Sequence, residues 1–112
     1  MLPEYYNFNG ENYIIFIGKN KYDNFNIIDE SIDTDIWFHI DGEPSCHVIL
    51  KNTLKIKNIP KIVIKRCAYL CKINSKSKTH AKCNVIYTQI INVTKTNIIG
   101  QVYAVNCKTI SI

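Results

Sequence analysis

The stretch DIWFHIDGEPSCHVILK, residues 35–51, consists of two short apolar runs around a polar segment that contains a glycine and a proline. The apolar runs are residues 36–40 and 46–50. Glycine and proline between two apolar runs are typical of a turn. Because the connecting segment is longer than two residues, the pattern predicts a β-hairpin with an extended loop, and we expect the rest of the fold to be arranged around it.

Side chains alternate between the two faces of a strand, so the first apolar run has two chemically different faces. One face carries Ile36, Phe38 and Ile40, and the other carries Asp35, Trp37, His39 and Asp41. A buried tryptophan normally needs a hydrogen-bond partner for its N–H group. Two interpretations stay open. Either an exposed indole and imidazole form a binding surface, or the tryptophan packs under a loop with the histidine as a structural neighbour.

Pairing across the predicted hairpin adds residues from its second strand. In an antiparallel pair His47 lies near His39, and alternation places Lys51 on the same face as His47. We therefore predict one functional cluster on this face. In it, Asp35 fixes the tautomer of one imidazole, and an exposed Trp37 offers a stacking surface to an unpaired base.

The hairpin also resembles the core motif of the NFACT-R domain family, which reads D-x-W-F-H followed by P-x-x-H-V. Supporting fragments are residues 17–20 with Asn24, 59–60, 85–88 and 100–102, so the resemblance covers nearly the whole chain. It implies that the residues of the motif and its neighbours bind nucleic acid: Asp35, Trp37, Phe38, His39, Ser45, His47 and Lys51. Gly18, Asn20 and Pro44 are expected to shape turns. One departure is that the usual Pro-Gly-Ser-His-Val is Pro44-Ser45-Cys46-His47-Val48 here, so the Cys46 thiol replaces a hydroxyl.

The resemblance further implies a biological context. NFACT-R domains belong to proteins of ribosome-associated quality control, which bind the large ribosomal subunit carrying a stalled peptidyl-tRNA. The sequence is most similar to the short eukaryotic branch, in which a basic coiled coil follows the domain, and we expect the present chain to be the bare module. The implied partner is RNA, with DNA as an alternative. A protein-interaction module that uses the Trp37/His39 face is a hypothesis of a different class.

Composition is that of one globular domain. The 112 residues are 46% hydrophobic and 21% charged, which is ordinary for a soluble fold. No apolar run is long enough to cross a membrane, and the first residues lack the pattern of a signal peptide. The five cysteines have no disulfide-framework spacing. We therefore expect reduced thiols and a cytoplasmic protein, with the nucleus as the alternative compartment.

Charge is distributed very unevenly along the chain. All nine acidic residues lie within residues 1–43, whereas residues 44–112 contain twelve basic residues and no acidic one. Such a single-sign segment is typical of a polyanion-binding protein, and a merely solvated lysine-rich face is the alternative. A helix predicted from Pro60 to about residue 75 places several of these cations on one narrow stripe, which the following loop extends: Lys61, Lys65, Tyr69, Lys72, Lys76, Lys78 and Lys82.

Hydrophobic periodicity and turn residues predict the remaining elements. We expect hairpins at residues 4–17, around Asn9-Gly10, and at residues 102–112; a short helix at 20–31; and a strand at 83–90. The order of hairpins and helices predicts an α+β domain, in which a mostly antiparallel sheet of hairpins has two helices packed against it.

No catalytic or cofactor site is expected. Cys46 and His47 are adjacent, so on a strand they point to opposite faces, and no oxyanion-hole motif accompanies them. Four soft ligands occur as Cys67, Cys71, His80 and Cys83, but their spacing is not that of a zinc finger. Cys67 and Cys71 fall on the buried side of the predicted helix, where cysteine is common. We therefore expect neither a metal nor an enzyme, and there is no glycine-rich phosphate loop.

Overall fold

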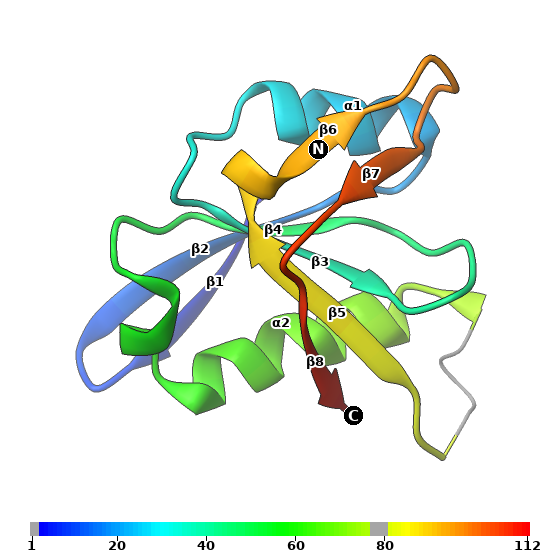
Figure 1. The fold of residues 1–112 in the computed structure, drawn as a ribbon. Helices are drawn as coiled ribbons and strands as arrows, with labels where there is room; N and C mark the ends of the chain where they lie inside the picture. The colour runs from blue at the N-terminus through cyan, green and yellow to red at the C-terminus, as the bar shows by residue number, and fades with distance from the viewer. Residues whose placement is uncertain (1–2, 77–80) are drawn as a thin grey trace.

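The computed structural model describes residues 3–76 and 81–112, and its fold is drawn in Figure 1. The elements in chain order are β1 (Pro3–Phe8), β2 (Glu11–Ile17), α1 (Lys21–Asp29), β3 (Ile36–Ile40), β4 (Val48–Leu50), η1 (Ile56–Asn58), α2 (Lys61–Ile73), β5 (Asn84–Gln89), η3 (Ile90–Asn92), β6 (Val93–Lys95), β7 (Val102–Ala104) and β8 (Lys108–Ser111). These elements confirm the predicted α+β class.

Six strands form the main sheet in the order β1-β2-β4-β3-β5-β8, and every neighbouring pair is antiparallel. The predicted central hairpin is therefore in the middle of the sheet. Its register pairs Trp37 with Ile49 and Phe38 with Val48. The second strand is shorter than expected, because residues 46 and 47 belong to the connecting segment.

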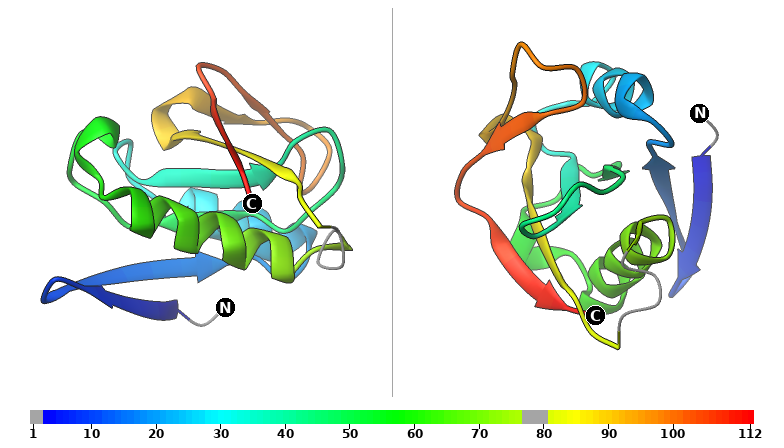
Figure 2. Two further views of the ribbon diagram at one scale, coloured as in Figure 1. Left: turned by 90° about the horizontal axis from the view of Figure 1, so that it is seen from below. Right: turned by 90° about the vertical axis from the view of Figure 1, so that its right-hand side faces the viewer.

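The sheet is covered on both faces, which gives three layers (Figure 2). Helix α2 packs against one face and contacts β2, β3, β4 and β5. Helix α1 and the separate β6–β7 hairpin cover the other face. Strand alternation explains both contacts: Ile36, Phe38 and Ile40 join the cluster under α2, whereas Trp37 joins the cluster under α1 and the hairpin.

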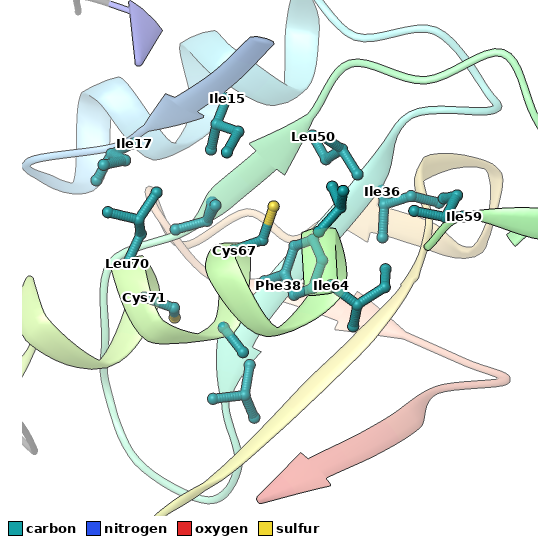
Figure 3. Packing of buried hydrophobic residues seen from close by; sticks show 14 of the residues in the cluster. Ile15, Ile17, Ile36, Phe38, Leu50, Ile59, Ile64, Cys67, Leu70 and Cys71 are labelled. Carbon is teal, nitrogen blue, oxygen red and sulfur yellow. The ribbon is translucent and has the colours of Figure 1, made fainter. Parts of the chain in front are cut away.

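The larger core lies between the sheet and α2 (Figure 3). Its side chains come from strands β2, β3, β4 and β5 and from one side of the helix. Cys67 and Cys71 are fully buried in it, as their helical spacing predicted. Arg66, on the flank of α2, lies 5.7 Å from the rings of both Tyr6 and Tyr69, so a cation–π contact ties the helix to β1.

The N-terminal half follows its sequence signals closely. Asn9 and Gly10 adopt φ angles of 52° and 80°, which is the left-handed pair that a tight two-residue hairpin requires. Helix α1 begins after Asn20, whose side-chain oxygen accepts hydrogen bonds from the main-chain N–H groups of Tyr22 and Asp23. Asn20, which we expected to shape a turn, is the N-cap of this helix.

The C-terminal region differs from the prediction in its strand pairing. We expected β7 and β8 to form a hairpin, but β7 pairs with β6 and β8 pairs with β5. Asn106, with φ of 56°, turns the chain between the two layers. The carbonyls of Val105 and Asn106 accept from the Thr88 hydroxyl at 3.2 and 3.3 Å. The sequence did not predict strand β6, because a strand of three residues is too short to show the alternation of apolar and polar side chains.

Candidate functional site

Trp37 is buried, so the prediction of an exposed stacking indole is wrong. Only 2% of its surface is exposed, because α1 and the β6–β7 hairpin cover this face of β3. Its indole N–H donates to Nδ1 of His47 at 3.1 Å. The partner that a buried tryptophan needs is thus the histidine ten residues later in the chain.

His47 holds the sheet, α1 and the β6–β7 hairpin together. Its main-chain N–H donates to Oδ1 of Asn24 at 3.1 Å, and its carbonyl accepts from the N–H of Gly18 at 2.8 Å. Its ring also hydrogen-bonds the backbone of Gly100. Because Nδ1 accepts from Trp37, the remaining ring nitrogen carries the proton of a neutral imidazole.

Burial keeps the His47 ring neutral. Desolvation, followed by the nearby His39, lowers the pKa of His47 to about 3, against a smaller raising effect of the Gly100 hydrogen bond. Protonation would add a positive charge to a ring that is almost completely buried, and it would remove the acceptor of the Trp37 N–H group. The role of His47 in the structure is therefore to accept and donate hydrogen bonds as a neutral group.

Within the predicted cluster, His39 and Lys51 are partly exposed. The His39 ring stacks on Trp37, with the ring centroids 5.5 Å apart. It contacts the His47 ring edge-on, with the centroids 5.0 Å apart. The two histidines are therefore neighbours across the hairpin, as predicted. Burial lowers the pKa of His39, and Nδ1 lies 2.6 Å from the carbonyl oxygen of Ile40. In the neutral ring Nδ1 donates to that carbonyl, which leaves Nε2 as an acceptor.

Asp35 does not orient an imidazole, which corrects the sequence-based expectation. Its carboxylate is completely buried and forms an ion pair with Lys51. It also accepts main-chain hydrogen bonds from Asn52 at 2.8 Å and Ile32 at 2.9 Å. The reason is that Asp35 precedes β3, where the surrounding loops present N–H groups to it. Asp35 and Lys51 thus connect two loops beside the sheet.

Two further motif residues have structural positions. Phe38 is completely buried on the α2 side, where its ring stacks on that of Tyr87 with the centroids 5.4 Å apart. It cannot contact nucleic acid in this fold, so its inclusion among the binding residues is wrong.

The Ser45 hydroxyl accepts from the N–H of Ile40 at 3.1 Å and donates to the carbonyl of Cys46 at 2.9 Å. It therefore closes the turn between β3 and β4, next to Pro44.

Gly18 allows a close approach to Asn24 on α1. A Cβ atom at this position would lie 2.0 Å from Oδ1 of Asn24. The absent side chain lets that oxygen reach the N–H group of His47. Asn24 is part of the family resemblance, but sequence analysis did not assign it this contact, because an asparagine in a weakly amphipathic helix gives no signal of its partner.

The predicted basic stripe is mostly exposed. Lys61, Lys65, Tyr69, Lys76 and Lys82 are at the surface, and Lys78 lies outside the described residues. Lys72 is the exception: it is buried, and its ammonium group donates to the carbonyl oxygens of Ala81 and Ile112 at 3.3 and 3.1 Å. The periodicity of α2 could not reveal this, because the segments that cover Lys72 follow the helix in sequence.

The exposed cations are largely free of acidic partners. Within residues 3–76 and 81–112, ion pairs link only Lys51 to Asp35 and Lys95 to Asp29. The lysines of α2 and of its C-terminal end therefore keep their charge available to a solvent-borne anion.

Two adjoining pockets lie beside the turn between β3 and β4. The first has a volume of about 620 Å³ and lies between His39, the β3–β4 turn and the tip of the β6–β7 hairpin. The second has a volume of about 490 Å³ and lies between the start of α1 and the end of α2. Both are lined by Lys21, Asn24, Pro44 and Ser45, so they adjoin along these residues, and we call the two pockets together the groove. The groove, rather than the face of Trp37, is the open part of this region.

The cysteines show no arrangement for catalysis or metal binding in the described part of the chain. Cys46 lies on the α2 side of the sheet, with its thiol 3.4 Å from the carbonyl of Cys71 and 3.6 Å from the hydroxyl of Ser75. Residues 3–76 and 81–112 contain no group of three potential ligands. His80 lies outside those residues, so the expectation of no metal remains a prediction.

The profile of the family described as "NFACT protein RNA binding domain" matches residues 3–105. This chain belongs to the NFACT-R family. The "Coiled-coil domain-containing protein 25" of Mus musculus is 42% identical over 91 residues, which are 79% of this chain and 44% of that protein. The protein of the same name in Danio rerio is 39% identical over 73% of this chain and 41% of its own length. The NFACT-R chain described here thus spans less than half of these relatives.

A solved structure shares the NFACT-R fold found here. The C-terminal part of the fibronectin/fibrinogen-binding protein from Streptococcus suis superposes with a TM-score of 0.86 over 98% of this chain and 45% of that one, at 24% identity. At this identity the similarity is one of fold. Among the described residues, no helix has the length and apolar character needed to cross a bilayer.

Proposed function

We propose that this NFACT-R domain is an RNA-binding module, not an enzyme, and that it acts on the tRNA or rRNA of the large ribosomal subunit in the cytoplasm. The observation that carries the proposal is the set of exposed lysines on α2 and at its C-terminal end that have no acidic partner among the described residues. Lysines of this kind bind phosphates as point charges and give affinity with little sequence specificity.

Membership of an RNA-binding family supports the choice of RNA over other polyanions. The ribosomal context rests on the family resemblance, in which NFACT-R domains belong to proteins of ribosome-associated quality control. Single-stranded DNA presents the same phosphate spacing to lysines, so it is the closest competing ligand. The proposal expects tRNA and single-stranded RNA to bind more tightly than DNA of equal length.

Salt dependence tests the electrostatic part of the proposal. We expect fluorescently labelled tRNA to bind at about 50 mM salt and to lose affinity steeply by 200 mM, because each neutralised phosphate releases counterions. Lys65→Glu and Lys76→Glu are each expected to weaken binding about threefold to tenfold and to lower the slope of log affinity against log salt by about 1 or more.

Lys108→Glu is the matched control, since it changes the net charge equally at an exposed position on β8. It should change affinity less than twofold. Equal losses for all three variants would indicate a response to net charge and not a defined surface. Absence of binding to any RNA at 50 mM salt would overturn the proposed function.

A protein partner is the second candidate, and exposed apolar side chains favour it. Ile98, Ile99 and Tyr103, all on the β6–β7 hairpin, are 55%, 43% and 68% exposed. An interface anchored by these residues would respond weakly to salt, because its affinity comes from apolar burial. A complex that persists unchanged from 50 to 200 mM salt would therefore favour this candidate.

A further inference from the structure

The first pocket has a feature that the basic surface alone does not explain. It is concave, with a volume of about 620 Å³, which lies within the range of sites that enclose small molecules. Apolar side chains from β5 and the β6–β7 hairpin line it: Ile86, Ile99, Val102 and Ala104. The partly exposed His39 also lines the pocket, beside its cross-strand partner Ile86 and at the end of the stack of rings on β3. A flat aromatic group is the kind of ligand that such a slot accommodates.

His39 supplies a directional polar group in this pocket. Its ring plane is fixed by the stack on Trp37, with an angle of 13° between the planes. Its Nδ1 is occupied by the carbonyl of Ile40, and Nε2 has no hydrogen-bond partner among the described residues. A neutral histidine therefore presents one acceptor nitrogen to a ligand, which matches the N–H donors on the edges of nucleobases.

The walls of the pocket are already held in place without a ligand. The tip of the β6–β7 hairpin contacts α1 closely, because a Cβ at Gly100 would lie 2.6 Å from the Cβ of Lys21. The Gly100 backbone also hydrogen-bonds the ring of His47. A preformed site of this kind binds its ligand without a large ordering cost.

Charge at the mouth of the groove indicates how the ligand is oriented. The second pocket is lined by Lys19, Lys21 and Lys76, with no carboxylate among its lining residues. The first pocket, by contrast, is lined by Glu43 as well as by Lys21. A ligand with an aromatic end and an anionic end would therefore place its aromatic end in the first pocket and its anionic end in the second.

We propose that this groove takes one unpaired nucleotide of RNA, with the base in the pocket beside His39 and the adjacent phosphate between Lys19, Lys21 and Lys76. The inference rests on the proposed RNA-binding function and adds a site to it. The exposed lysines of α2 bind paired or unpaired RNA through phosphates, whereas the groove recognises a nucleotide that is out of a helix. Such recognition is the usual way in which proteins read RNA.

Three RNA hairpins of equal length separate this site from general RNA binding. One contains a single bulged nucleotide, the second has an abasic site at the bulge, and the third is fully paired. We expect the wild-type domain to bind the first about tenfold more tightly than the second, a difference of about 1.4 kcal/mol. His39→Leu, which removes the acceptor and keeps an apolar side chain, should abolish this preference while binding to the paired hairpin remains.

Ile99→Ser and Ile98→Ser provide a matched pair if His39→Leu fails to fold. Both residues are exposed and adjacent, but only Ile99 lines the pocket. The preference for the bulged RNA should fall for Ile99→Ser and persist for Ile98→Ser. Equal wild-type affinity for the bulged and abasic hairpins would overturn the nucleotide site and favour a protein side chain as its occupant. Absence of binding to all three would overturn the RNA-binding function itself.

Discussion

At the scale of single residues, neighbouring groups of the same motif have different roles. Trp37 and His47 satisfy each other's hydrogen bonds inside the molecule, whereas His39 keeps one acceptor facing a pocket. The sequence predicted that the two histidines would meet. It left open whether the tryptophan is exposed or packed under another segment, and it could not decide between the two, because the hairpin that covers Trp37 begins more than fifty residues later.

The buried neutral His47 predicts a dependence of stability on pH. The unfolded chain protonates this histidine near pH 6.5, but the folded domain does so only near pH 3. The unfolded state therefore binds more protons between these values, and stability falls as the pH is lowered. From pH 6.5 to 5, where ordinary carboxylates stay ionised, we expect the free energy of unfolding to fall by up to about 1.4 kcal/mol per pH unit from this group.

Urea unfolding at several pH values measures this slope. His39 contributes in the same direction, because burial lowers its pKa as well. The variant His47→Asn, which does not titrate, should be less stable at pH 7 and should show a clearly smaller slope between pH 6.5 and 5. An unchanged slope in that variant would show that His47 is not the group responsible.

Two ion pairs of different burial give a second prediction at this scale. Asp35 is fully buried and has three partners, whereas the Asp29–Lys95 pair is exposed. We expect Asp35→Ala to lower the free energy of unfolding by about 3 kcal/mol or more, because it leaves Lys51 and two main-chain N–H groups without the buried carboxylate that they contact. Asp29→Ala should cost less than about 1 kcal/mol. Similar losses in thermal unfolding experiments would contradict this assignment.

At the scale of elements, local signals predicted the N-terminal half better than the C-terminal half. Asn9-Gly10, Asn20 and Pro60 mark the beginnings of turns and helices that the structure contains. The pairing of β7 with β6 and of β8 with β5 has no such local marker. These pairings depend on contacts between segments that are distant in the sequence, which local patterns do not reveal.

The close contact between the β6–β7 hairpin and α1 gives a prediction for this scale. At Gly100 an added Cβ would lie 2.9 Å from the Cα of Lys21, and φ is +86°. At Gly42, φ is +78° but nothing lies within 4 Å. Both alanine variants therefore have backbone strain of about 1 kcal/mol, but only Gly100→Ala also forces the hairpin away from the helix.

We expect Gly100→Ala to destabilise the domain roughly twice as much as Gly42→Ala. Hydrogen exchange should show lost protection at residues 93–104 in Gly100→Ala and unchanged protection there in Gly42→Ala. Equal effects of the two substitutions would mean that the hairpin does not depend on close approach at Gly100.

At the scale of the whole molecule, the fold places the uneven charge of the sequence on defined surfaces. The exposed lysines of α2 lead to Lys76, which borders the groove together with Lys19 and Lys21 from the acidic half. The sequence predicted the stripe on α2, except for Lys72. It did not predict that two lysines from the other half would face the end of that helix, because only the folded chain brings α1 and the end of α2 together.

The central claim is that RNA lies along the exposed face of α2 and enters the groove beside His39. An NMR titration of ¹⁵N-labelled domain with the bulged RNA hairpin tests it most directly, since amide signals report on every element at once. The account predicts the largest shift changes at residues 18–24, 42–46, 74–76 and 99–102, with smaller changes along the exposed side of α2. Shift changes confined to β1, β8 or the outer side of the β6–β7 hairpin, with the groove unaffected, would contradict it.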